Sequence, residues 1–67
     1  MISFSKLWKL MDERKITAYR LRESCGFDSK TIRRLKSNEN TETKTLNKIC
    51  AFMNCRLEDI AEYIPEE

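Results

Sequence analysis

The chain has 67 residues, which allow one domain at most and leave little room for a substrate pocket with its supporting shell. Its 40% hydrophobic and 36% charged residues are typical of a folded domain and not of a disordered segment. The net charge is +2, but residues 1–36 carry ten lysines and arginines against four acids, whereas residues 37–67 carry three against seven. This asymmetry fits either a basic face that meets an anion or an unevenly charged solvated surface.

The first half of the chain predicts two helices joined to a third by a tight turn. Apolar residues at a spacing of three to four predict a first helix that ends near Arg14 and Lys15; they are Phe4, Leu7, Trp8, Leu10 and Met11. Thr17 is predicted to be the N-cap of a second helix that runs through about Ser24 and is anchored by Leu21. Gly26 is the only glycine, and we expect it to end that helix in a left-handed conformation.

The next segment predicts a short, strongly basic third helix. Asp28 or Ser29 caps it, it runs from about Ser29 to Ser37, and Ile32 and Leu35 form its buried side. Asn38 is expected to leave the helix in a left-handed conformation.

The last third of the chain predicts two further helices after a polar loop over residues 38–42. We expect Thr43 to cap the fourth helix, whose apolar stripe is Leu46, Ile49, Cys50 and Met53. A fifth, short helix is predicted from about Leu57 to Tyr63, with Ile64 in the core and Pro65 as its end. No alternating pattern indicates a strand, so the predicted class is all-α with five helices.

The outward face of the third helix suggests a function. Two short helices around a glycine turn can be a plain structural corner, but this helix carries four cations and no acid. Like charges this close destabilise an isolated helix, which favours a polyanionic neighbour over a merely solvated face. Arginine and lysine donate to guanine edges in the DNA major groove, and helix N-termini bind phosphate. The pattern therefore favours a helix-turn-helix from about Thr17 to Ser37.

Residues 16–60 resemble the helix-turn-helix family of phage repressors and Cro, the XRE type, and look like its compact bacterial and mobile-element members. The residues that carry the resemblance lie in the turn, the core and the trailing segment: Ile16-Thr17, Leu21, Gly26, Thr31-Ile32, Leu35, Leu46, Ile49, Met53 and Leu57-Glu58-Asp59-Ile60. The resemblance implies a lambda-repressor-like domain over residues 1–67. It also implies double-stranded DNA as the partner and transcriptional repression by operator occupancy as the function.

The resemblance also implies roles for individual residues. Ser29, Lys30, Arg33 and Arg34 are expected to contact base edges in the major groove. The expected phosphate contacts flank them: Thr17, Ala18, Arg20, Thr31, Lys36, Ser37 and Asn38.

Four residues depart from the family pattern. Arg22 occupies a position where the family usually has a small alanine between the two helices, and we expect its stem to extend outward. Ala18 replaces a polar phosphate-contacting residue, Lys36 replaces a glutamate, and Asn38 replaces a glycine. Lys36 and Arg20 are expected to add charge that compensates for Ala18.

Other functions receive little support from the sequence. The chain has no histidine, and no base flanks Cys25, Cys50 or Cys55, so we expect no enzymatic activity. The cysteines are expected to be reduced thiols in a cytoplasmic protein, with a three-thiolate metal sensor as the minor alternative. We expect no cofactor, membrane span or small-molecule ligand, and a weak or DNA-assisted homodimer. The competing interpretation is a protein-interaction module on the same fold, such as an antitoxin-like or adaptor protein.

Overall fold

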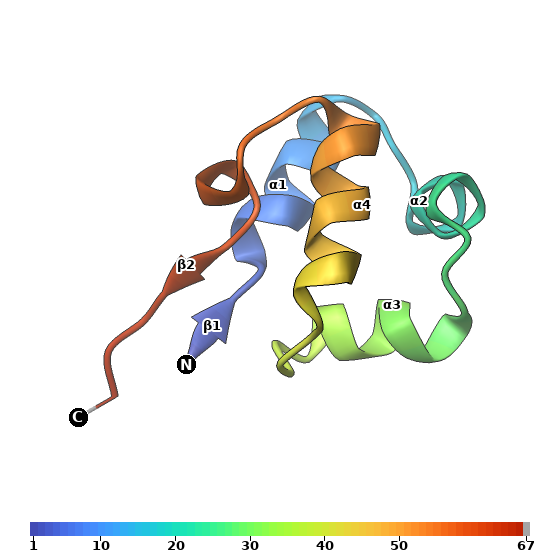
Figure 1. Ribbon diagram of the computed structural model, residues 1–67. Coiled ribbons are helices and arrows are strands. Elements are labelled where there is room, and N and C mark those ends of the chain that lie inside the picture. The colour runs from blue at the N-terminus through green and yellow to red at the C-terminus, as the bar shows by residue number, and fades with distance from the viewer. Residues whose placement is uncertain (67) are drawn as a thin grey trace.

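The computed structural model describes residues 1–66 and contains four α-helices, one 3₁₀ turn and a two-stranded ribbon (Figure 1). In chain order the elements are β1 (Ile2–Ser3), α1 (Ser5–Glu13), α2 (Ala18–Cys25), α3 (Ser29–Lys36), α4 (Thr43–Met53), η1 (Leu57–Asp59) and β2 (Glu62–Tyr63). The helices surround one core made of Phe4, Leu7, Met11, Leu21, Ile32, Leu35, Ile49, Met53 and Ile60. The predicted first four helices are present.

The termini of the helices follow the sequence signals in most places. Gly26 ends α2 with φ +71°, and Asn38 has φ +56° directly beyond α3, so both predicted left-handed exits are present. The predicted caps of α2 and α3 are also correct. Thr43, however, is the first residue of α4 and not its N-cap. The cap position belongs to Glu42, whose side chain makes no capping hydrogen bond.

The predicted fifth helix from Leu57 to Tyr63 is wrong. Only Leu57–Asp59 are helical, and they form a single 3₁₀ turn. The Arg56 N–H donates to the Asp59 carboxylate at 2.9 Å and so caps this turn. The chain then extends, and β2 pairs antiparallel with β1. Two turns of helix before a proline would have few internal hydrogen bonds, and proline disfavours helical geometry in the preceding residue. Pairing with β1 supplies backbone partners instead.

The two-stranded ribbon brings the first and last described segments together (Figure 1). Ile2 lies opposite Tyr63, and the Ile64 N–H donates to the Met1 carbonyl at 2.7 Å. Ile64 is 39% exposed, so the prediction that it belongs to the core is wrong. Because the chain is not helical here, Ile64 does not share a helix face with Ile60, four residues earlier, which is fully buried.

Candidate nucleic-acid interface

α2 and α3 form two short helices fixed by side-chain caps and a glycine turn. The Thr17 hydroxyl accepts from the Arg20 N–H at 3.1 Å, and the Asp28 carboxylate accepts from the Thr31 N–H at 2.8 Å. Between them, the left-handed Gly26 lets the Phe27 N–H donate back to the Arg22 carbonyl at 2.9 Å. Each cap satisfies the third amide of its helix, and the first two amides still face outward from the helix end. The turn therefore sets α3 at a fixed angle to α2 (Figure 1).

The Asp28 cap is electrostatically stabilised. The hydrogen bond from the Thr31 N–H is the main reason that the pKa of the Asp28 carboxyl is lowered, and the charge of Lys30 acts in the same direction. The carboxylate is therefore ionised at neutral pH, where it balances the partial positive charge of the α3 N-terminus.

α3 divides cleanly into a buried and an exposed side. Ile32 and Leu35 are buried against the core. The four predicted base-contacting residues are all exposed and lie along one face, because residues four apart on a helix are neighbours: Ser29, Lys30, Arg33 and Arg34. This face holds three cations and no acid. It can meet the edges of base pairs while the buried side stays in the core.

The predicted phosphate-contacting residues flank this face but differ in their exposure and in the contacts they already make. Arg20, Lys36 and Ser37 are exposed, and so is Thr17, although its hydroxyl already caps α2. Ala18 and Thr31 are half-buried; Ala18 can offer only its backbone, and the Thr31 backbone N–H already donates to the Asp28 carboxylate.

Two of these residues have structural contacts that the sequence does not reveal. The Asn38 side-chain oxygen accepts from the Phe4 N–H at 2.8 Å, which connects the exit of α3 to the start of α1. The Lys36 ammonium lies 5.7 Å from the centroid of the Trp8 ring. Trp8, one of the apolar residues that predict the first helix, is half-buried and packs against the core.

Arg22 contacts a predicted site residue although it is not itself among the predicted contacts. Its guanidinium donates to the Ser29 hydroxyl at 3.2 Å and lies 5.2 Å from the centroid of the Tyr19 ring. Its Nε is 3.8 Å from the carboxylate of Glu23. The Arg22 side chain thus extends from α2 to Ser29, the first residue of α3. A cation in place of the usual alanine was the signal that could have identified it.

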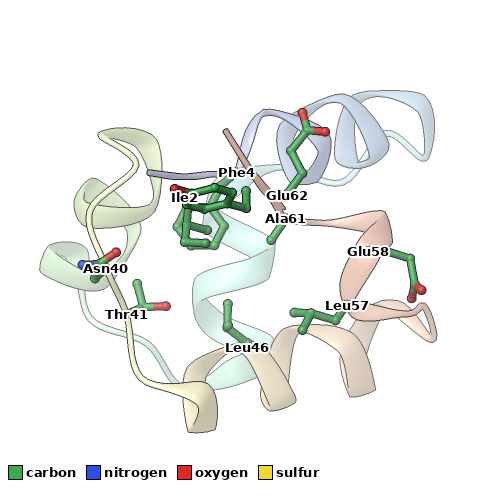
Figure 2. Close-up of a pocket in the computed structure, with 10 residues that line it drawn as sticks. Ile2, Phe4, Asn40, Thr41, Leu46, Leu57, Glu58, Ala61 and Glu62 are labelled. Carbon is green, nitrogen blue, oxygen red and sulfur yellow. The ribbon is translucent and has the colours of Figure 1, made fainter. Parts of the chain in front are cut away.

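A second surface feature is an apolar hollow of about 480 Å³ that is lined by residues outside α3 (Figure 2). Figure 2 shows Leu46 and Leu57 on one side of it and Phe4 and Ala61 on the other. Leu57 is 53% exposed and Tyr63, which also lines the hollow, is 65% exposed. The sequence did not indicate this hollow, because the strand β2 that borders it was predicted as helix.

The cysteines are three free, half-buried thiols. Burial raises the pKa of Cys25 against a smaller opposing effect of Lys48, and burial together with the nearby Cys50 raises the pKa of Cys55. Thiols with raised pKa values are poor nucleophiles at neutral pH. Among residues 1–66, no group of histidine, cysteine or acidic side chains is arranged to hold a metal ion. The same residues contain no helix that is long and apolar enough to cross a membrane.

The fold and the basic face of α3 define the class of the molecule: a small helix-turn-helix domain that binds DNA. A family model for the Cro/C1-type HTH DNA-binding domain matches residues 6–66, and the chain belongs to that family. It is also similar to a solved structure, the crystal structure of the transcriptional regulator VanUg, with 40% identity and a TM-score of 0.92. That match covers 97% of this chain and 87% of the other. No curated protein sequence gives a significant match. The chain is thus a DNA-binding regulator and not an enzyme.

Proposed function

We propose that residues 1–67 act as one domain that represses transcription by occupying a specific operator. The observation that carries the proposal is the exposed face of α3, where Ser29, Lys30, Arg33 and Arg34 lie side by side and the opposite side is buried. In this proposal α3 enters the major groove and the four side chains contact base edges. The proposal places the protein in a bacterial cytoplasm, as its resemblance to compact bacterial regulators implies.

The flanking residues complete the proposed contact with DNA. Arg20 on α2 and Lys36 at the end of α3 add exposed charge, and the other five residues lie at or near the helix ends: Thr17, Ala18, Thr31, Ser37 and Asn38. These positions suit phosphate oxygens, which determine register on the duplex but not sequence. Phosphate contacts release counterions, so binding should weaken steeply as salt rises.

Selection from a random duplex library across a salt series tests the proposal. The wild type is expected to enrich a short sequence and to lose affinity steeply with salt. Arg34→Ala should lose discrimination at one base pair, whereas Lys36→Ala should weaken binding to all sequences and flatten the salt slope by about one charge. The two variants control for each other, because each removes one cation from α3. Equal losses on every sequence in both would refute the assignment of Arg34 to base contact.

We further propose a weak or DNA-assisted homodimer. One short recognition helix makes few contacts, and domains of this kind usually bind two half-sites about 34–36 Å apart. Leu57 and Tyr63 are large side chains exposed at the hollow, and Ile64, the next residue after Tyr63, is exposed as well, so a second copy can cover them. Sedimentation with and without duplex DNA should show pairing mainly on DNA, and Leu57→Asp should remove it. Unchanged pairing in that variant would place the dimer contact elsewhere.

The same hollow supports a second candidate function, a protein-interaction module of the antitoxin-like or adaptor kind. In that case the library would enrich no sequence above the electrostatic background, even at low salt. Lys30, Arg33 and Arg34 would then serve as a basic surface for a protein partner.

A further inference from the structure

A notch between the starts of α2 and α3 contains a charged residue that no predicted contact uses. The notch is a hollow of about 220 Å³ lined by Ala18, Tyr19, Arg22, Ser29 and Ile32. Ala18 and Ile32 contribute apolar side chains to it, and Arg22 is the one charged residue among these five. The small side chains at positions 18 and 29 leave space for the long arginine stem to cross from α2 to α3.

The Arg22 guanidinium makes three contacts. The Ser29 hydroxyl accepts from one of its terminal nitrogens at 3.2 Å, and the Tyr19 ring supports it at 5.2 Å. The third contact, to the Glu23 carboxylate, is an exposed pair at 3.8 Å and is weak. A planar guanidinium that is restrained from two sides is partly preorganised for binding, because less side-chain entropy is lost on contact.

The hydrogen bond between Arg22 and Ser29 determines what the pair can offer to a base. A serine hydroxyl has one donor hydrogen and two acceptor lone pairs, and a guanidinium has five N–H donors and no acceptor. Once the hydroxyl accepts from Arg22, its hydrogen points away from the arginine. The pair therefore presents mainly donors, side by side, at the N-terminal end of α3. That end of a recognition helix is the part that meets base edges.

We propose that Arg22 and Ser29 recognise one base pair as a unit and select guanine there. Guanine presents two adjacent acceptors, N7 and O6, in the major groove, whereas cytosine and adenine present amino groups that an array of donors rejects. Arg22 is thus a specificity-determining residue contributed by α2 and not by the recognition helix. The inference rests on the proposed function, since it assumes that α3 enters the major groove.

The test compares base preferences by library selection for the wild type, Arg22→Ala, Ser29→Ala and the double variant. Each single variant should lose about tenfold of its discrimination at the same base pair and keep the rest of the motif. The double variant should lose no more than either single one, because the two residues act together. Arg20→Ala is the matched control, since it removes an exposed arginine from the same helix. It should lower affinity evenly on all sequences. Thermal unfolding verifies that each variant is folded, and Ser29→Ala tests the pair without altering α2.

The outcomes separate this inference from the function on which it rests. A wild type that enriches no sequence refutes both. A wild type with a clear motif that Arg22→Ala leaves unchanged, or weakens evenly at all positions, refutes the role of Arg22 alone. Effects of Arg22→Ala and Ser29→Ala at different base pairs refute their joint action. A selected base other than guanine at the shared position refutes the proposal that the pair acts as an array of donors.

Discussion

Position 38 requires a residue that adopts a left-handed backbone and carries a side-chain hydrogen-bond acceptor, and neither glycine nor alanine provides both. The Asn38 backbone has φ +56°, and its side-chain oxygen accepts from the Phe4 N–H at 2.8 Å. Asn38→Gly keeps the backbone freedom and loses the hydrogen bond, so we expect a loss of about 1–2 kcal/mol in the free energy of unfolding. Asn38→Ala also forces a side chain into the left-handed region and should lose about 2–4 kcal/mol. The total free energy of unfolding of a domain of this size is roughly 3–10 kcal/mol.

Asn38→Asp is the control that separates the two demands. Aspartate keeps an oxygen acceptor and tolerates the left-handed region, so the free energy of unfolding of this variant should stay within about 0.5 kcal/mol of the wild type. Urea unfolding followed by circular dichroism measures all three variants. If Asn38→Asp were as unstable as Asn38→Gly, the bond to Phe4 would be refuted. Equal stability of the glycine and alanine variants would refute the backbone argument. Glycine, the residue usual in the family, is thus expected to destabilise this chain.

Three further predictions concern the helices of the interface. Because the folded state lowers the pKa of Asp28, its stabilising effect is present above the ordinary pKa of an aspartate and is lost as pH falls through the folded value. Urea unfolding at pH 6 and pH 3 should therefore show a smaller acid effect in Asp28→Asn, which still caps α3; an identical acid effect would contradict this. Glu23→Gln removes the acid beside Arg22 and should strengthen DNA binding about two- to fivefold at low salt. Fluorescence anisotropy measures the affinity, and no change would show that Glu23 does not compete with DNA for Arg22. Leu35→Ala should lower the free energy of unfolding, measured by chemical denaturation, by about 2–5 kcal/mol, because Leu35 is fully buried. A loss below about 1 kcal/mol would place Leu35 outside the core.

Local signals in the sequence were sufficient to predict the helix-turn-helix. The caps at Thr17 and Asp28 and the left-handed Gly26 act within a few residues, so their effect can be inferred without knowledge of the fold. The buried side of α3 follows equally from spacing. These local features place the basic residues on one exposed face.

The errors occur where distant segments meet. β2 forms because β1 lies beside it, and the two strands are about sixty residues apart, so no local pattern reveals the pairing. The same reason applies to the bond between Asn38 and Phe4. Arg22 is an intermediate case. Its unusual identity was visible, but its contact with Ser29 depends on how α2 and α3 cross.

The contact between Lys36 and Trp8 gives this protein an intrinsic optical reporter. Trp8 is the only tryptophan, it lies on α1 and not on α3, and a cation on α3 lies 5.7 Å from its ring centroid. If Lys36 turns toward a phosphate when DNA binds, the ring loses that cation and its emission changes. Titration of unlabelled protein with DNA would then follow occupancy directly, without a dye or a tag near the interface.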